Sequence, residues 1–432
     1  MERILSSELS AHIGEHVLIA GWLHHQRPLS KLTFVLVRDR AGITQIVASG
    51  EAAAQFAALL PETVVSVEGR VVASAQAPAG VELVEPTLTV ISVPVGAPTI
   101  ALAAPVLQES LPTILDHAAT GLRHPRAQAT FAISAASVAG FRAALDAAGF
   151  TEIMSPKLVG GATESGASVF KVDYFGAEAY LAQSPQFYKQ TMVGVFERVY
   201  ETAPVFRAEP HDTVRHLAEY VSLDAEMGFI TDYHEVMAMA REAVAGMLAG
   251  VGARAPEAVK LLGLTLPTVP AVIPEIDFVV AQGMIEAATG EKVVGEPDLA
   301  PAHERWLGEW AQANYGSDFL FVTGYPMSKR PFYTAPQAGR SAYSASFDLL
   351  FRGLELITGG QRLHRYEDYL AALSARGMTS VGLEGYLEAF AAGMPPHGGF
   401  AIGLERWTAR LTGAANIRET TLFPRDRHRL TP

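Results

Sequence analysis

The chain contains no cysteine in its 432 residues. This absence excludes disulfide bonds, thiolate zinc sites, iron–sulfur clusters and thiol catalysis, and it fits a reducing cytoplasm. Charged residues are also scarce, at 18%, whereas 49% of the residues are hydrophobic. A chain of this composition can bury a large core, and its length predicts two or three domains.

Basic residues are outnumbered, with 33 Lys and Arg against 45 Asp and Glu, which gives a net charge of −12. Such a balance excludes a protein that coats nucleic acid through bulk charge, although it leaves room for a local basic face.

One uncharged run, Pro86–Gln108, is 23 residues long, but its four prolines exclude a lipid-exposed helix. The residues Met1–Leu5 already include charged side chains, which is not typical of a signal peptide. We therefore expect a cytoplasmic protein with no membrane association.

Residues 16 to 93 have the pattern of short strands: Val17–Trp22, Leu32–Val37, Ile43–Val47, Thr63–Val71 and Val81–Val93. A polar turn is expected at His25–Pro28, and a short helix at Glu51–Leu60. Five strands with a helix between the third and fourth predict an OB-fold barrel, although another small Greek-key barrel has the same strand count.

A proline-rich connector, Pro94–Pro112, follows this region. After it, a helix is expected over Arg126–Ala148, and strand-like and helical segments then alternate to the C-terminus. The predicted fold class is α+β, with a barrel at 1–95, a linker at 96–118 and a large domain at 119–432. A mostly helical insertion is expected at about 231–316.

Charged residues interrupt two apolar strand patterns of the large domain. Arg207 and Glu209 end one of them, and Ser222, Asp224 and Glu226 alternate along the next. Residues two apart share a strand face, and several charges on one central face are costly unless they hold a charged ligand. A solvated outer face with paired charges is the alternative.

Two later segments carry similar chemistry. Asp348 and Glu355 are hard oxygen ligands suited to Mg²⁺, and Arg362 offers a planar fork to a carboxylate. Gly398–Arg406 brings two glycines and an arginine to the start of a helix. Each glycine run alone is weak evidence, because tight turns explain most of them.

The order of these segments, placed after Phe150–Pro156, closely resembles the class II aminoacyl-tRNA synthetases. Pro156 ends a segment similar to motif 1, Phe206–Glu209 resembles motif 2, and Gly403–Arg406 resembles motif 3. The barrel, with Gly21-Trp22 and Val37–Gly42, resembles the anticodon-binding domain of the enzymes for aspartate, asparagine or lysine. The resemblance covers essentially the whole chain and implies a catalytic domain built on an antiparallel sheet flanked by helices.

Within that subclass, Gln183–Lys189 resembles the amino-acid pocket of aspartyl-tRNA synthetases. The short spacing between motifs 2 and 3 and the segment Arg362–Tyr366 resemble the archaeal type. The resemblance implies that Lys189 and Arg362 hold the substrate's side-chain carboxylate. Two cations suit a carboxylate and leave an amide underpaired. A surface lysine is the alternative interpretation of Lys189.

The resemblance also implies the remaining roles. Catalytic roles fall on Arg207, Glu355 and Arg406. Aspartate is expected to contact Glu164, Gln186, Lys189, Arg207, Asp224, Thr358 and Arg362. ATP is expected to contact Arg207, Ala208, Glu209, Arg215, His216, Leu217, Tyr220, Glu355, Gly403, Leu404, Glu405 and Arg406. Mg²⁺ is expected at Asp348, Glu355 and Thr358, and the anticodon at His25, Arg27, Phe34, Gln45, Pro78 and Glu82.

Two of these residues have alternative interpretations. Asp224 could instead be a buried partner of Arg207, and Phe34 could be a barrel core residue rather than a platform for an anticodon base. Between residues 22 and 46 the local net charge is +3, which fits contact with anticodon phosphates.

The activity implied is that of a homodimeric ligase that joins L-aspartate to tRNA-Asp, using ATP and Mg²⁺. His25 and Pro78 stand where enzymes restricted to the aspartate anticodon tend to carry bulkier or charged residues. We therefore expect that tRNA-Asn is also a substrate. The alternatives are an asparagine–tRNA ligase, a non-catalytic tRNA-binding paralogue and an asparagine synthetase of the same fold.

Overall fold

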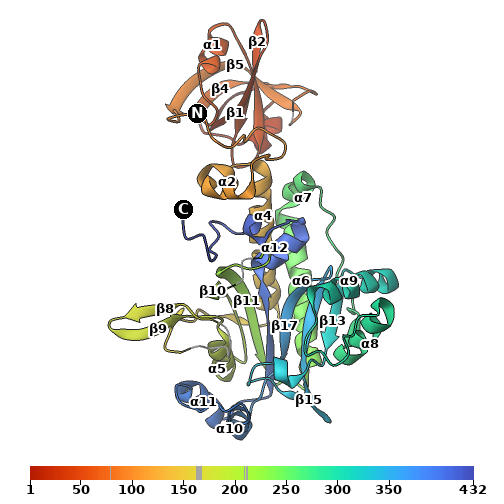
Figure 1. Cartoon of the computed structure of the whole chain (residues 1–432). Helices are drawn as coiled ribbons and strands as arrows, with labels where there is room; N and C mark the ends of the chain where they lie inside the picture. Colours follow the sequence, from red (N-terminus) through yellow and green to blue (C-terminus); the bar gives the residue numbers. More distant parts are fainter. Residues whose placement is uncertain (78, 162–167, 209, 211–212) are drawn as a thin grey trace. The chain divides into compact units, whose positions relative to one another are not determined.

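A computed structural model describes residues 1–77, 79–161, 168–208, 210 and 213–432. The chain divides into two compact units, Met1–Pro125 and Arg126–Pro432 (Figure 1). The limits predicted for a barrel, a linker and a large domain stay a prediction.

The N-terminal unit is a five-stranded barrel with the helix α1 (Gly50–Ala57) between its third and fourth strands. The strands close in the order β1-β2-β3-β5-β4. Their inward residues, such as Val35, Ile46 and Val67, are fully buried. The predicted OB-fold is therefore confirmed. The strands are β1 (His16–Pro28), β2 (Leu32–Arg38), β3 (Ile43–Ser49), β4 (Val64–Ala73) and β5 (Val81–Ser92).

The polar turn predicted at residues 25–28 is wrong, because β1 continues through it. The register between β1 and β2 shifts between Leu23 and His25, and His25 then pairs with Leu36. A bulge of this kind lets a strand bend and still pair with its neighbour. The chain turns instead after Pro28, where the amide of Leu29 donates to the carbonyl of Leu32 at 2.8 Å.

The rest of this unit is a connector with two short helices. Residues 94–110 form neither helix nor strand, and they are followed by α2 (Leu111–Asp116) and α3 (Ala118–Gly121). Glu62 joins the connector to the barrel by pairing with Arg38 at 2.9 Å and with Arg123 at 3.1 Å.

An eight-stranded sheet organises the C-terminal unit, in the order β12-β13-β16-β17-β18-β11-β10-β6. Its six central strands are antiparallel, and β6 and β12 pair parallel to their neighbours at the two edges. The sheet is therefore mixed at its edges rather than antiparallel throughout. Its strands are β6 (Thr151–Glu152), β10 (Arg198–Phe206), β11 (Glu219–Gly228), β12 (Glu275–Asp277), β13 (Phe319–Thr323), β16 (Ser346–Phe351), β17 (Glu355–Gln361) and β18 (His397–Gly403).

Long helices cover one face of this sheet. The helices α4 (Pro125–Ala147) and α6 (Tyr233–Arg254) run alongside each other, and α12 (Leu404–Thr412) packs near them (Figure 1). Their apolar side chains meet those of β11, β16 and β18 in one core. The helix α6 is long and apolar enough to cross a bilayer, but half of its most apolar window is buried in this domain. A helix that lies on a sheet needs that apolar surface.

Smaller elements surround the sheet. They are β7 (Leu158–Val159), β8 (Lys171–Tyr174), β9 (Ala177–Leu181), α5 (Gln186–Phe196), α7 (Pro256–Leu262), α8 (Phe278–Thr289), α9 (Pro301–Tyr315), β14 (Pro336–Gln337), β15 (Arg340–Ser344), α10 (Tyr366–Ala375) and α11 (Glu384–Ala391), with the 3₁₀ turns η1 (Ser6–His12), η2 (Met327–Lys329) and η3 (Ile417–Thr420). The segment predicted as an insertion thus contains α6 to α9 together with β12, which joins the main sheet.

The contact between α4 and α6 depends on glycine. A Cβ atom at Gly140 would lie 2.1 Å from the carbonyl oxygen of Gly246, so the two backbones touch there. We predict that Gly140→Ala lowers the free energy of unfolding by about 1–3 kcal/mol, because the helices must move apart. Urea denaturation followed by circular dichroism measures this change.

The matched control for this substitution is Gly283→Ala in α8, where a Cβ atom would meet nothing within 4 Å. Alanine is the better helix former, so this change should be neutral or stabilising by up to about 1 kcal/mol. Equal effects of the two substitutions would contradict the close contact between α4 and α6.

Candidate active site

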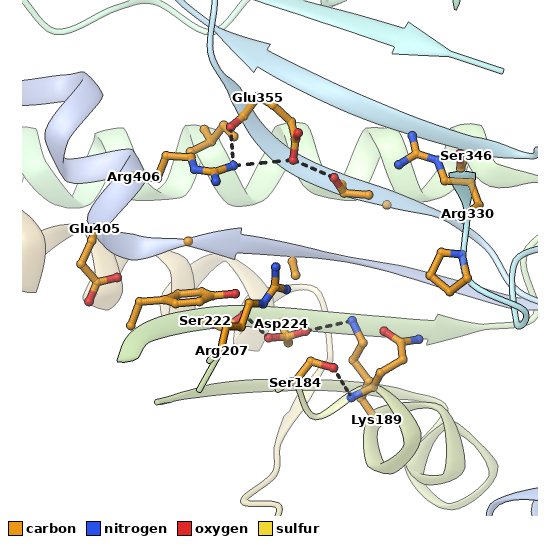
Figure 2. Close-up of a pocket in the computed structure, with 18 of the residues that line it drawn as sticks. Ser184, Lys189, Arg207, Ser222, Asp224, Arg330, Ser346, Glu355, Glu405 and Arg406 are labelled. Carbon is orange, nitrogen blue, oxygen red and sulfur yellow. Dashed lines mark hydrogen bonds and ion pairs between the residues drawn. The ribbon is translucent and has the colours of Figure 1, made fainter. Parts of the chain in front are cut away.

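The uncovered face of the sheet forms one wall of a cavity of about 320 Å³. Side chains from β11, β17 and α5 converge on it (Figure 2). Residues 215–217 and residues of β18 complete its lining. Fourteen residues predicted from the sequence line this cavity. They are Gln186, Lys189, Arg207, Arg215, His216, Leu217, Tyr220, Asp224, Glu355, Thr358, Arg362, Gly403, Glu405 and Arg406.

Strand alternation explains why these side chains meet. On β11, Leu223 and Ala225 face the helices and are fully buried in the core. The intervening residues Ser222 and Asp224 therefore face the cavity, as the two-residue period of a strand requires. The predicted charged face of this strand is thus the wall of a cavity, and it is not a solvated outer surface.

The charged floor of the cavity is a group of four buried residues: Lys189, Asp224, Glu226 and Arg362. The ammonium nitrogen of Lys189 lies 3.0 Å from a carboxylate oxygen of Asp224 and 3.3 Å from one of Glu226. Arg362 Nε lies 2.9 Å from the other oxygen of Glu226. We call these four residues the charge cluster.

All four residues of the charge cluster are less than 8% exposed. Burial alone would raise the pKa of Glu226, but the charges of Arg362 and Lys189 hold it below its usual value. The cluster therefore balances two cations against two anions. A surface lysine, which was the alternative interpretation of Lys189, is wrong.

Behind the charge cluster lies a hydrogen-bonded network of uncharged groups. The amide nitrogen of Gln190 donates to the Tyr369 hydroxyl and lies 3.0 Å from His397 Nε2, while the Tyr386 hydroxyl donates to the Gln190 oxygen. Burial lowers the pKa of His397 to about 4, so its ring is neutral. This network fixes α5, which carries Lys189, against α10, α11 and β18.

A pair of carboxylates lies at the other end of the cavity. Asp348 on β16 lies opposite Thr358 on the neighbouring strand β17. The Thr358 hydroxyl donates to the Glu355 carboxylate at 3.1 Å. Arg330 neutralises Asp348 at 2.9 Å. Burial and the charge of Glu355 nevertheless outweigh Arg330 and raise the pKa of Asp348 to about 6.

These three oxygen-bearing residues fit a magnesium ion bound together with phosphates. Within the described part of the chain, no group of three or more His, Asp or Glu is arranged to hold a metal. Mg²⁺, however, commonly takes only one or two protein carboxylates and completes its shell with phosphate and water. The pKa of Asp348 is raised mainly by burial, and a cation bound beside it would favour its ionised form.

The motif 2 and motif 3 arginines enter the cavity from different directions (Figure 2). Arg406 donates to the carbonyl of Glu355 at 3.0 Å, and Arg207 lies 5.6 Å from the ring centre of Tyr220. Arg207 stands one residue beyond the end of β10, so the expected strand stops earlier than predicted. Glu405 accepts from the Val221 amide, and burial raises its pKa to about 7.

Several predicted residues lie elsewhere. Ala208 and Leu404 do not line the cavity; the Leu404 side chain packs in the core, so only its backbone is close to the site. Asp348 is buried behind the cavity wall. Glu164, Glu209 and Pro78 lie outside the described residues.

On the barrel, the predicted anticodon residues that the structure describes form one strip. Arg27 pairs across strands with Phe34, and His25 pairs with Leu36, whose partner on β3 is Gln45. Gln45 donates to Glu82 at 2.7 Å. Because Phe34 alternates with the buried Thr33 and Val35, its ring faces away from the barrel interior. The alternative in which Phe34 is a core residue is wrong.

Fewer basic side chains are exposed near this strip than the sequence predicted. Arg38 is buried and paired with Glu62, so it cannot face a nucleic acid. Asp39 is also buried and accepts from the amide and hydroxyl of Ser6. The exposed cations of this region are Arg27, Lys31 and Arg40.

The sequence did not predict the roles of Arg330, Glu304 and the network around Gln190. Arg330 follows Lys329 in a polar segment, and its pattern does not distinguish it from a surface residue. In the structure its side chain is 12% exposed, lines the cavity and lies over the ring of Tyr325, 4.2 Å from the ring centre. Glu304, on α9, accepts from the amide of Glu355 at 3.0 Å. No local signal predicts either contact, because the partners are at least 18 residues away.

Comparison with known proteins agrees with this architecture. Residues 110–427 match the family model for tRNA synthetases class II (D, K and N), and residues 17–91 match that for the OB-fold nucleic acid binding domain. An aspartate–tRNA(Asp/Asn) ligase of Thermus thermophilus is 47% identical over 430 residues, covering both chains completely. A protein of the same name from Aeropyrum pernix is 43% identical, covering 97% of this chain and 96% of its own.

Solved structures of both specificities are similar to this chain. Asparaginyl-tRNA synthetase from Pyrococcus horikoshii, complexed with asparaginyl-adenylate, superposes with a TM-score of 0.93 at 30% identity, and each chain is covered completely. Aspartyl-tRNA synthetase from Entamoeba histolytica gives a TM-score of 0.88 at 28% identity, covering 100% of this chain and 93% of its own.

A barrel of the OB type and an eight-stranded sheet with this cavity define a class II aminoacyl-tRNA synthetase, an enzyme that uses ATP as a substrate. The chain belongs to the D, K and N family of class II tRNA synthetases.

The charge cluster makes a prediction about stability. In Glu226→Gln, Lys189 keeps its contact with Asp224, whereas Arg362 loses the carboxylate that lies 2.9 Å from its Nε. We expect the free energy of unfolding to fall by about 3 kcal/mol, because an uncompensated buried charge is left behind. Chemical denaturation measures this, with the exposed Glu388→Gln in α11 as the control, expected within about 0.5 kcal/mol of the wild type. Equal stability of the two variants would contradict the cluster.

Proposed function

We propose that this protein joins L-aspartate to tRNA, activating it with ATP to aspartyl-adenylate and passing it to the tRNA 3′ end. The observation that carries the proposal is the charge cluster. It places Lys189 and Arg362 at the cavity floor, where a side-chain carboxylate can pair with both. An amide would bring no negative charge to these two cations, and its NH2 group would face their hydrogen-bond donors. Relatives named for aspartate support this choice.

Each cation of the cluster already has a carboxylate partner. The substrate carboxylate must therefore share Lys189 and Arg362 with these partners. Asp224 lies at the cavity surface between Lys189 and Ser222, whose hydroxyl donates to it. We infer that Asp224 binds the ammonium of aspartate while Lys189 turns toward the substrate carboxylate. Glu226 stays beneath and holds Arg362 in place.

Activation needs no strong base, because the attacking α-carboxylate is already ionised. Its oxygen attacks the α-phosphorus of ATP, and the bond to the β-phosphate breaks, so the electron pair leaves with pyrophosphate. Arg207 aligns the carboxylate with the α-phosphate, while Arg215, His216 and Arg406 neutralise the leaving phosphates. Tyr220 provides a flat surface for the adenine ring.

Asp348, Glu355 and Thr358 would hold Mg²⁺, which supplies positive charge to the phosphates when bound. Arg330 occupies the same end of the cavity and offsets Asp348 in the absence of that charge. Ala208, Glu209, Leu217, Gly403, Leu404 and Glu405 complete the proposed nucleotide site, with Glu164, Gln186 and Thr358 at the amino acid.

We propose that tRNA-Asn is charged as well as tRNA-Asp. The relatives that are 47% and 43% identical carry names for both tRNAs. His25 is exposed on the strip that also contains Arg27, Phe34, Gln45 and Glu82. A histidine is smaller than the bulky residues that the family resemblance associates with enzymes restricted to the aspartate anticodon. The proposal also includes Pro78, a homodimer formed through the edge strand β6 and its exposed neighbour Met154, and a cytoplasmic location.

An asparagine–tRNA ligase is the second candidate, because the asparaginyl enzyme of Pyrococcus horikoshii has a TM-score of 0.93 to this chain. That candidate requires asparagine to be activated in preference to aspartate. A non-catalytic tRNA-binding paralogue would have no use for arginines on both sides of the cavity.

The test is aminoacylation with radiolabelled L-aspartate on purified tRNA-Asp and tRNA-Asn, side by side. We expect both tRNAs to be charged with kcat/KM values within about tenfold of each other, a difference of about 1.4 kcal/mol. His25→Trp should lower the charging of tRNA-Asn more than that of tRNA-Asp. Charging of tRNA-Asp alone would refute the dual specificity, and charging of neither would refute the ligase.

A further inference from the structure

A second cavity, of about 250 Å³, lies beside the main one and shares Arg215, Arg406 and Ile417 with it. Its remaining walls come from the start of α9, from residues 353–354 between β16 and β17, and from residues 409–415 at the end of α12. We call it the side cavity.

Four arginines line the side cavity: Arg215, Arg305, Arg406 and Arg410. Among the described residues that line it, none is an aspartate or a glutamate. Arg406 also lies 3.6 Å from the carboxylate of Glu355, which lines the main cavity. Arginines gathered in this way repel one another and concentrate anions from solution. The composition of these walls therefore selects a ligand with several negative charges.

The hydrogen-bond donors of two of these arginines are incompletely used. Arg410 Nε is buried and has no hydrogen-bond partner in the described part of the chain, although its terminal nitrogen donates to the carbonyl of Arg352. Burial, together with the nearby Arg352 and Arg305, lowers the pKa of Arg410. Arg305 is exposed and forms no hydrogen bond or ion pair with any described residue. Guanidinium donors of this kind suit phosphate oxygens.

We propose that the side cavity binds inorganic pyrophosphate after it leaves the α-phosphate, as a site separate from the one occupied by the phosphates of bound ATP. The inference rests on the proposed function, which makes pyrophosphate the leaving group. Arg215 and Arg406 belong to both cavities, so the product moves along them toward Arg305 and Arg410. Its withdrawal from the adenylate opposes the reverse attack on the α-phosphorus.

The experiment measures the binding of ³²P-labelled inorganic pyrophosphate by equilibrium dialysis. The enzyme is tested both free and loaded with a sulfamoyl analogue of aspartyl-adenylate, which fills the main cavity but carries no pyrophosphate. Both forms of the wild type should bind pyrophosphate. Arg305→Gln should weaken this binding about tenfold, which corresponds to one lost charged hydrogen bond. The exposed Lys292→Gln, which removes the same charge outside the cavity, should bind as the wild type does.

Arg410→Lys provides a second test, because it keeps the charge and removes the buried Nε donor; it should also weaken the binding. No pyrophosphate binding to the analogue-loaded enzyme would overturn the proposal. Equal pyrophosphate binding by the wild type and Arg305→Gln would overturn it too. So would an Arg305→Gln variant that binds pyrophosphate normally and loses only its binding to an RNA acceptor stem. If the proposed function is wrong, the aspartyl-adenylate analogue itself will not bind. Pyrophosphate binding to the free enzyme, compared between the wild type and Arg305→Gln, then still tests the side cavity.

Discussion

Two cations and two anions buried in one place are the constraint on which the catalytic unit depends. Charges without water are tolerated only when each has a partner at hydrogen-bond distance, so the positions of α5, β11, β17 and β18 are fixed relative to one another. Gly399 illustrates how tight the arrangement is: a Cβ atom there would lie 2.0 Å from Glu226 Oε2. A glycine that looked like a simple turn residue is needed so that a charged side chain can cross the sheet surface.

The same constraint explains how a protein with a net charge of −12 handles anionic substrates. Cationic side chains are gathered in three places: the floor of the main cavity, the side cavity and the barrel strip. Each location differs in how its cations are balanced. Asp224 and Glu226 balance the two cations of the charge cluster, which the substrate carboxylate would share, whereas no aspartate or glutamate is among the described residues that line the side cavity. The former suits recognition of one amino acid, and the latter suits transient capture of a product.

Much of this architecture follows from the sequence, because it depends on local patterns. Alternation along 219–228 placed Ser222, Asp224 and Glu226 on one face, and the spacing of apolar residues predicted α4 to within a residue at each end. The contacts that the sequence did not predict join distant segments. Glu226 meets Arg362 across 136 positions, and Arg38 is neutralised by Glu62, which reverses its expected exposure. The turn predicted at 25–28 became strand because pairing with β2 outweighed local turn preference.

Selection of a carboxylate over an amide by the charge cluster is the central claim, and amino acid-dependent pyrophosphate exchange tests it most directly. With the wild type, kcat/KM for L-aspartate should exceed that for L-asparagine by roughly 10³-fold or more, since an amide brings no negative charge to Lys189 and Arg362. Lys189→Met should reduce this ratio by at least about tenfold, chiefly through a higher KM for aspartate. Equal activation of the two amino acids by the wild type, or a preference for asparagine, would contradict the account.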